Sequence, residues 1–494
     1  MDADVIIIGS GMGGATLAAA LAPSGRQVMI LERGKHLCQS PQDRDAGAIF
    51  GDGVFRPDET WLDGQDRPFN PGNYYCVGGN SKFYGAALIR YRASVFEQVE
   101  HPGGRSPAWP MGYDELEADY QVAEKMYAVR GRAMDDPTEP YHSGDHPFAP
   151  VPDEPDIAAL RKRLTRARVH PSHIPTGVDL DAWMDAGQTT LDAYPNTCGA
   201  KMDAESCGLA EALAHDNVSL QTSCAVTRLE TDAAGRVTAA LLEDGKRLIS
   251  SLFVVAAGAV QSAALLLRSA NENCPTGLAN RSDQVGRNFM NHNCSAVLAL
   301  HLLRKNRSVY QNTLMLNDFY ELSEGFPPLG NVQMLRKVTG SILAATTRLP
   351  GPIAQMIAAR SFDFYAMSED LPTPDSRVTL KSGQIKLDWQ RSNWEAHTQL
   401  VKELKRVLRG IGFPIAVSKA FDRRMPSHQS GTARLDDDQA TSVVNSHCRS
   451  HDHPNLFIVD ASVLPTCAAV NPALTIAALA LRAGGHITET EFAA

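Results

Sequence analysis

The sequence contains no apolar run that approaches the roughly 18 residues needed to cross a bilayer. It also has no excess of positive charge, because 47 Lys and Arg stand against 56 Asp and Glu and give a net charge of −9. No local cluster of Lys and Arg interrupts this acidic composition. An acidic protein does not suit the polyanionic surface of a nucleic acid. We therefore expect neither a membrane nor a nucleic acid as a partner.

Cysteine and aromatic residues are also sparse. Nine cysteines, an odd number, are scattered through 494 residues, which predicts reduced thiols rather than a disulfide framework. A redox disulfide between Cys198 and Cys207 is the less favoured alternative. The first apolar strand begins at residue 4 and leaves no room upstream for a signal peptide, so we predict a cytoplasmic enzyme. The aromatic share of 7% favours no particular substrate.

The N-terminal segment has the element order of a dinucleotide-binding unit. An apolar, β-branched run at 4–8 predicts a buried parallel strand, and a glycine-rich turn and a helix over 15–22 follow it. A second apolar strand at 27–31 ends at Glu32. The alternative is a glycine-rich turn in an ordinary α/β protein. Such a turn would not need to have a strand on each side or to be followed by Glu32.

Each residue type in this segment has a physical role. Gly9 permits a tight turn, Gly11 lets the backbone approach a pyrophosphate, and Gly14 lets the helix pack closely on the strand. The helix N-terminus offers free amide N–H groups to the phosphates. Glu32 suits a ribose diol and would repel a 2′-phosphate.

The rest of the chain predicts about two to three domains from its length. A second strand–glycine–helix unit suits the same nucleotide fold, and short strands with one amphipathic helix suggest a separate substrate domain. The expected elements are a loop-rich excursion at 36–75, a helix at 114–129, a connection at 132–156, two strands within 217–242, a strand at 252–257, a helix at 261–268, short strands in 295–425 with a helix at 394–408, a strand at 455–460 and a helix at 473–482.

Motifs along the whole chain resemble those of the glucose–methanol–choline (GMC) flavin oxidoreductases. The block near the C-terminus is the most specific, since an unrelated nicotinamide enzyme has no reason to carry it. The matching segments are 5–11 with Glu32, 78–81, 256–259, 285–288, 428–432, 455–456, 460–462 and 471–472.

The resemblance implies an α/β fold, with a Rossmann-like FAD-binding domain and a second, substrate domain that contains an antiparallel sheet. By this resemblance the FAD-binding domain is discontinuous and comprises residues 1–100, 200–294 and 426–494. Residues 101–199 and 295–425 would form the substrate-binding domain.

The resemblance also implies FAD as cofactor. Several relatives attach it covalently through a His shortly after the double glycine, but Phe83 occupies that position here, so we predict non-covalent binding. The N-terminal turn would hold the ADP half, and the helix that follows Pro472 would direct its N-terminus at the flavin N1–C2=O edge. The implied cofactor-binding residues are Gly9, Gly11, Met12, Gly14, Glu32, Arg33, Gly78, Gly79, Asn80, Ser81, Val226, Ala257, Gly258, Asp460, Ala461, Asn471, Pro472 and Thr475.

His428 and Asn471 match the catalytic pair of the family. Hydride transfer from an alcohol carbon requires the hydroxyl proton to leave, and a His is suited to accept it. Asn471 can hold the substrate oxygen through its amide but cannot take a proton. A core or capping histidine beside Gly431 is the alternative for His428.

The implied activity is oxidation of a primary or secondary alcohol, on a sugar, a polyol or a hydroxylated metabolite. An FAD-containing lyase of the same fold and a non-catalytic flavoprotein remain as alternatives, whereas a light-driven decarboxylase would lack the His. The sequence is equally compatible with oxygen or with another electron acceptor. It is also equally compatible with a monomer or a homodimer. Asn312, Gln333 and Tyr365 are candidate lining residues.

One other cluster suggests a metal site. His447, Cys448, His451 and His453 are dense enough to hold an ion, but they lie in a short polar loop directly before a strand. The family chemistry requires no metal, so we predict none.

Overall fold

The computed structural model describes residues 1–187, 193–321, 327–422 and 428–492. Its seven-stranded sheet has the order β8-β2-β1-β11-β10-β9, and β19 also pairs with β11. The β1, β2, β8, β11 and β19 strands pair in parallel, whereas β9 and β10 continue the sheet antiparallel. The parallel part confirms the expected Rossmann-like fold. The strands are β1 (Ala3–Ile8), β2 (Val28–Leu31), β8 (Val218–Gln221), β9 (Val226–Thr231), β10 (Val237–Leu242), β11 (Arg247–Val255) and β19 (Leu456–Ile458).

Residues 217–242 form three strands rather than the two expected. The turn that the sequence predicts joins β9 to β10, but β8 pairs with β2 and is separate from β9. The chain leaves the sheet between them because Ser223 adopts a φ of 56° and the amide of Cys224 donates to the carbonyl oxygen of Glu32, at 2.9 Å. This excursion brings the start of β9 next to the end of β2.

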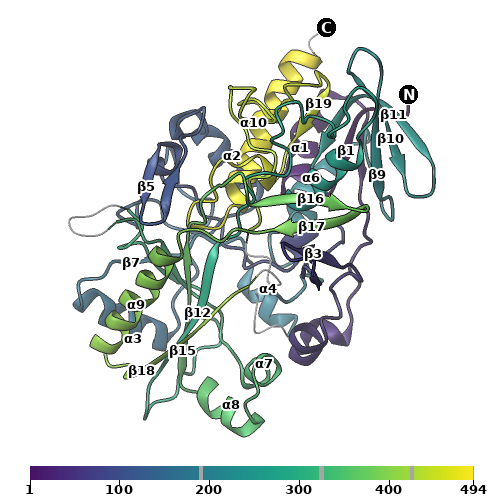
Figure 1. Cartoon of the computed structure of the whole chain (residues 1–494). Coiled ribbons are helices and arrows are strands. Elements are labelled where there is room, and N and C mark those ends of the chain that lie inside the picture. The colour runs from purple at the N-terminus through teal and green to yellow at the C-terminus, as the bar shows by residue number, and fades with distance from the viewer. Residues whose placement is uncertain (188–192, 322–326, 423–427, 493–494) are drawn as a thin grey trace.

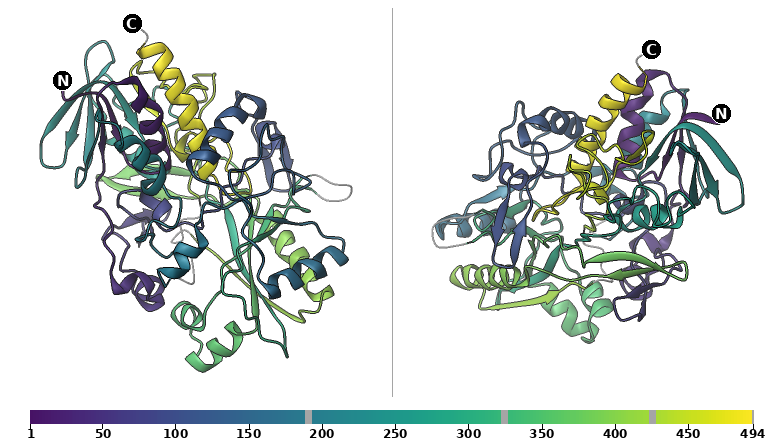
Figure 2. Two further views of the ribbon diagram at one scale, coloured as in Figure 1. Left: turned by 180° about the vertical axis from the view of Figure 1, so that it is seen from behind. Right: turned by 45° about the horizontal axis from the view of Figure 1, so that its top comes forward.

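Helices α1 (Met12–Leu21) and α10 (Ala473–Glu491) lie side by side against the parallel sheet, as both views of Figure 2 show. Close contact needs glycine, since a methyl group at Gly484 would lie 2.6 Å from the Ala20 side chain. The α10 helix extends beyond the expected residue 482 because buried Ala483 and Ile487 continue its apolar face. Helices α6 (Ala259–Arg268) and α2 (Glu117–Met126) confirm the two other helices expected in this part of the chain.

The six-stranded sheet is entirely antiparallel, with the order β18-β12-β15-β14-β13-β7. It confirms the antiparallel sheet that the resemblance implies. Helix α9 (Trp394–Gly410) packs on it through Leu400 and Leu404, and α3 (Pro155–Arg166) adds Ile157 and Leu160 to the same core (Figure 1). The strands are β7 (Pro171–His173), β12 (Asn293–Leu300), β13 (Leu314–Leu316), β14 (Asn331–Met334), β15 (Ser361–Ser368) and β18 (Ile415–Ala420).

The stretch 295–425 contains more helix than the single amphipathic segment that the sequence predicts. Helices α7 (Gly340–Thr346) and α8 (Gly351–Ala358) form a pair that buries Leu343 and Ala354 against β12. They escaped prediction because each is about two turns long and Pro350 interrupts the pattern between them. The remaining elements are α4 (Leu180–Asp185), α5 (Ala210–Leu213), β3 (Trp61–Asp63), β4 (Pro68–Phe69), β5 (Val99–His101), β6 (Gly104–Ser106), β16 (Arg377–Lys381) and β17 (Gln384–Asp388).

Two expectations about composition can be compared with the fold. Within the described ranges, no helix is both long and apolar enough to span a bilayer. All nine cysteines lie among the described residues and are free thiols, Cys198 and Cys207 included.

Candidate active site

Four parallel strands end at one edge of the main sheet, and each delivers a predicted site residue there. Gly9 follows β1, Glu32 follows β2, Gly258 follows β11 and Asp460 follows β19. Ligands of open α/β sheets bind outside the carboxyl ends of the strands. The fold therefore gathers residues that are far apart in the sequence at the position where a dinucleotide binds.

The two carboxylates at this edge organise the neighbouring turns. Glu32 accepts hydrogen bonds from the amide and hydroxyl of Ser10, at 3.1 and 2.7 Å. Asp460 accepts from the amide of Gly258 at 2.9 Å and from the hydroxyl of Ser262 at 2.5 Å. Each acid therefore fixes the glycine-bearing turn of an adjacent strand.

The glycines of the first turn have two different functions. A methyl group at Gly14 would lie 2.1 Å from the carbonyl oxygen of Gly9, and one at Gly13 would lie 1.9 Å from that of Val459. At Gly11, by contrast, an added methyl group would meet nothing within 4 Å. Gly13 and Gly14 thus serve helix packing, whereas Gly11 faces open space at the N-terminus of α1, where a pyrophosphate fits. The cofactor prediction did not include Gly13.

The second glycine segment lies against the first. The amide of Gly78 donates to the Ser10 hydroxyl at 3.1 Å, and a methyl group at Gly79 would lie 3.6 Å from the Cα atom of Gly11. The Ser81 hydroxyl donates to the carbonyl of Gly78 at 2.6 Å, so it stabilises this turn. Asn80 is exposed.

The other predicted cofactor residues lie at the same edge, but some of their side chains contact protein groups. The Arg33 guanidinium lies over the Tyr75 ring, at 3.9 Å from its centroid. The Thr475 hydroxyl forms a buried hydrogen bond of 2.8 Å with the Tyr120 hydroxyl. The remaining residues contribute backbone: Met12 begins α1, Val226 begins β9, Ala257 precedes Gly258, Ala461 follows Asp460, and Pro472 caps α10.

The structure brings the predicted catalytic pair together. The His428 Nε2 atom lies 3.4 Å from the Asn471 Nδ2 atom. The Asn471 Oδ1 atom accepts a hydrogen bond of 2.7 Å from the Nε2 amide of Gln333, which lies on β14. The antiparallel sheet therefore orients the amide of Asn471 so that its N–H groups face the His428 ring.

A second histidine, His292, sits directly behind His428. Its Nδ1 atom lies 2.8 Å from the His428 Nδ1 atom, and its Nε2 atom lies 2.7 and 2.9 Å from the carbonyl oxygens of Cys467 and Ala468. Carbonyl oxygens only accept, so His292 Nε2 carries a hydrogen. Burial lowers the pKa of His292 to about 4, so the ring is neutral and its Nδ1 atom is an acceptor.

The proton on His428 follows from this arrangement. Because His292 Nδ1 accepts, His428 Nδ1 must donate, and the lone pair of its Nε2 atom accepts from the Nδ2 amide of Asn471 at 3.4 Å. Burial and the neighbouring His292 lower the pKa of His428 well below its ordinary value. His428 is therefore a neutral imidazole with a lone pair available to accept a proton.

Sequence reasoning missed His292 and did not place Gln333. His292 immediately precedes β12 and comes shortly after the 285–288 motif, but no periodicity or spacing links it to His428. The sequence suggested that Gln333 lines the substrate site but did not indicate which residues it contacts there. Only the packing of β12 and β14 beside the C-terminal block brings them to the pair.

The polar loop at 447–453 has structural contacts. The His447 ring stacks on His486, with centroids 4.1 Å apart. The His451 Nε2 atom lies 2.9 Å from the Ser442 hydroxyl, and His453 Nε2 accepts from the amide of Ala279 at 3.0 Å. These histidines thus contact other segments of the fold, His447 through its ring face and His451 and His453 through ring nitrogens.

One solved structure and several curated sequences are similar to this chain over most of its length. Pyridoxine 4-oxidase from Mesorbium loti superposes with a TM-score of 0.66 at 17% identity and covers 99% of both chains. Paromamine 6'-oxidase from Streptomyces fradiae is 29% identical, over 97% of this chain and 90% of its own length. The fructose dehydrogenase large subunit from Gluconobacter japonicus is 25% identical, over 99% of this chain and 98% of its own.

Models of protein families match three stretches of the chain. Residues 7–55 match an NAD(P)-binding Rossmann-like domain, which fits the glycine turn and Glu32. Residues 174–294 and 372–480 both match GMC oxidoreductase models, and the second stretch includes His428 and Asn471. The chain belongs to the GMC oxidoreductase family.

Proposed function

We propose that this protein oxidises a primary or secondary alcohol with FAD as cofactor, and that His428 is the base. The observation that carries the proposal is the lone pair of His428 Nε2, which the contact with His292 leaves unprotonated and which faces the amide of Asn471. A non-catalytic flavoprotein would not need a histidine held in this protonation state, whereas a lyase is distinguished by a flavin that its substrate does not reduce.

The residues at the sheet edge fit FAD. Gly11 leaves space for a pyrophosphate at the N-terminus of α1, Glu32 lies where a ribose would bind, and Pro472 precedes α10. When bound, the flavin supplies the hydride acceptor. Non-covalent binding is supported by Phe83, which has no nucleophile and whose ring stacks on Tyr74 with centroids 3.7 Å apart.

The chain's own residues manage the proton. His428 Nε2 takes the hydroxyl proton of the alcohol as the hydride leaves its carbon, and the cation that forms still donates through Nδ1 to His292. Asn471 donates an amide N–H to the substrate oxygen and thereby orients the C–H bond. Gln333 keeps that amide in position.

The substrate class we propose is a sugar, a polyol or another polyhydroxylated metabolite. Paromamine 6'-oxidase and fructose dehydrogenase act on such molecules by their names, and 2-methyl-1,2-propanediol dehydrogenase from Mycolicibacterium austroafricanum, 27% identical, acts on a diol. In our proposal the antiparallel sheet belongs to the substrate domain (101–199 and 295–425), and the enzyme works in the cytoplasm as a monomer or a homodimer.

Anaerobic mixing of the FAD-loaded enzyme with sugars, polyols and simple alcohols tests the proposal. We expect one class to bleach the flavin absorbance, and admission of air then shows whether oxygen reoxidises it. A flavoprotein that no alcohol bleaches, while dithionite reduces it normally, would contradict alcohol oxidation.

Replacement of His292 tests the protonation state proposed for His428. His292→Gln keeps a donor toward the Cys467 carbonyl but removes the acceptor for His428 Nδ1, whereas His292→Asn keeps an acceptor near that position. We expect kcat to fall about 10²-fold in His292→Gln, the lower range for general-base catalysis, and to recover partly in His292→Asn. Stopped-flow flavin reduction with both variants measures this. Equal losses in the two variants at equal FAD content would contradict the role of His292.

A further inference from the structure

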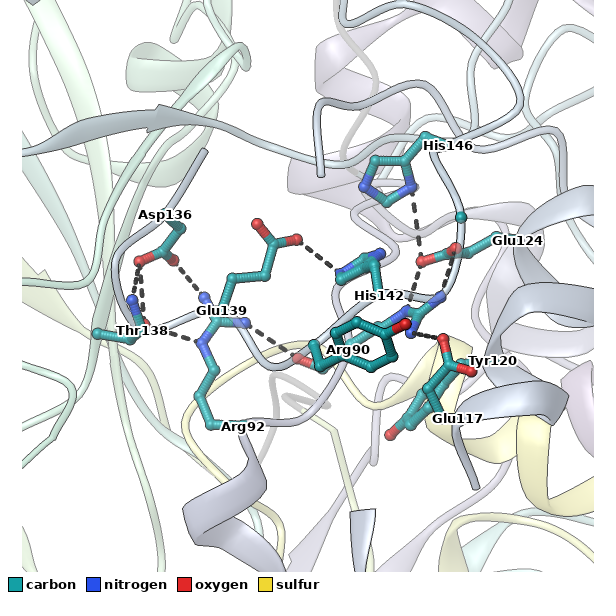
Figure 3. Close-up of polar contacts among 12 residues, drawn as sticks. Arg90, Arg92, Glu117, Tyr120, Glu124, Asp136, Thr138, Glu139, His142 and His146 are labelled. Carbon is teal, nitrogen blue, oxygen red and sulfur yellow. Dashed lines mark hydrogen bonds and ion pairs between the residues drawn. The ribbon is translucent and has the colours of Figure 1, made fainter. Parts of the chain in front are cut away.

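A buried cluster of metal-ligating side chains lies outside the candidate active site. Glu124 on α2 and His142 and His146 in the segment that follows place their ligand atoms within 4.8 Å of one another (Figure 3). Glu139 joins them, because its Oε1 atom lies 2.9 Å from the His142 Nε2 atom. The four side chains are between 1% and 7% exposed.

The two imidazoles have no ordinary hydrogen bonds in this cluster. Among the described residues, none of the four ring nitrogens of His142 and His146 has a hydrogen-bond partner. The His146 Nδ1 atom is 3.5 Å from Glu124 Oε1, and neither this contact nor that of His142 with Glu139 has hydrogen-bond geometry. Buried polar atoms in proteins are almost always satisfied, so these nitrogens require a partner of another kind.

The charges of the cluster favour a cation. The buried Arg90 guanidinium donates to Glu124 at 2.8 Å through both Nε and Nη2, and to Glu117 at 3.0 Å through Nη1. Arg90 contacts two acids, and Glu139 beside His142 adds a third carboxylate, so these four groups together carry a formal charge of −2. An uncompensated buried charge is costly, and a divalent cation would balance it.

We propose that Glu124, His142 and His146 bind one divalent transition-metal ion of the zinc type, with Glu139 beside His142. Two imidazoles with one carboxylate form a nitrogen and oxygen ligand set that Zn²⁺ accepts. Three protein ligands leave the fourth tetrahedral position to a water molecule. Arg90 holds the carboxylate of Glu124 from behind, as outer partners of metal ligands do.

The ion stabilises a part of the chain that has little regular structure. No helix or strand occurs between Met126 and Pro155, and all residues between them are described. The ion ties this segment to α2. Arg90 adjoins Tyr91, whose hydroxyl donates at 3.0 Å to the same Cys467 carbonyl that His292 contacts. The site therefore supports the backbone behind the catalytic histidine without taking part in the chemistry.

Cobalt binding to the unmodified full-length protein tests the proposal. After treatment with a chelator, titration with Co²⁺ should give the visible absorption bands of a four-coordinate site, saturate at about one ion per chain, and be reversed by Zn²⁺. Zn²⁺ should also raise the thermal unfolding midpoint of the chelated protein. Absence of both the bands and the shift in this protein overturns the proposal.

Three variants locate the ion. His142→Gln and His146→Gln should each weaken Co²⁺ binding by at least about 10–100-fold, while His170→Gln, which alters an exposed imidazole, should bind as the parent does. Glu139→Gln, at the edge of the cluster, should weaken binding as well and is used if the histidine variants do not fold. Unchanged Co²⁺ affinity in folded cluster variants contradicts the site. FAD content and flavin reduction, measured in parallel, separate failure of this proposal from failure of the proposed oxidation.

Discussion

The His428→Ala variant is expected to bind FAD normally and to lose most of its flavin reduction. Removal of the base should slow reduction by substrate about 10²–10⁴-fold, the range for a positioned general base. The side-chain hydrogen-bond partners of His428 are His292 and Asn471 and not the glycine turns, so cofactor content should not change. Stopped-flow reduction under anaerobic conditions, at saturating substrate, measures the rate constant directly.

The His428→Gln variant serves as the matched control for shape. A glutamine fills much of the same space and can hydrogen-bond to Asn471, but it cannot accept a proton, so it should be nearly as slow as His428→Ala. If His428→Gln reduces its flavin at the parent rate, His428 is a structural residue and the proposed role is wrong.

The pH dependence of the parent follows from the lowered pKa of His428. A base must be unprotonated to act, and burial keeps this imidazole neutral at pH values below the ordinary 6.5. We therefore expect the reduction rate to stay constant as pH falls through about 6.5 and to decline only in more acidic solution. A rate that halves near 6.5 would mean that the ring is solvated.

The Gly11→Ala variant should fold and yet fail to hold FAD. Gly11 has a φ of −72°, which alanine adopts freely, and its added methyl group meets no protein atom within 4 Å. If a pyrophosphate occupies that space, the methyl group overlaps it. A steric cost of about 1–3 kcal/mol lowers the FAD affinity about 10–100-fold. FAD titration of the apoprotein and thermal unfolding measure the two properties separately.

The Gly13→Ala variant, two positions further along the chain, is the matched contrast. Its methyl group would lie 1.9 Å from the Val459 carbonyl oxygen, so α1 must move away from β19 whether or not a cofactor is bound. We expect a lower unfolding midpoint for the apoprotein of this variant.

Parent-like FAD affinity in Gly11→Ala would show that the pyrophosphate does not lie against Gly11.

Local sequence patterns predicted the Rossmann-like fold of the N-terminal segment. Gly9, Gly11, Gly14 and Glu32 act through backbone conformation and short-range geometry within one strand–turn–helix–strand unit, so their spacing is already evidence of their roles. The amphipathic pattern of 394–408 predicted α9 for the same reason, because periodicity is a local property. Resemblance supplied the His428–Asn471 pair, which the fold then placed within 3.4 Å.

Only the tertiary structure decided how that pair works. His292 fixes the proton on His428, and Gln333 fixes the amide of Asn471, although His292, just before β12, and Gln333, on β14, are both distant in sequence from the pair. The cluster of Glu124 with His142 and His146 likewise joins a helix to an irregular segment, while the denser run of His and Cys at 447–453 contacts side chains and backbone of other segments. Side-chain hydrogen bonds and ligand sets depend on distances between atoms of different elements, and those distances exist only after the elements have packed.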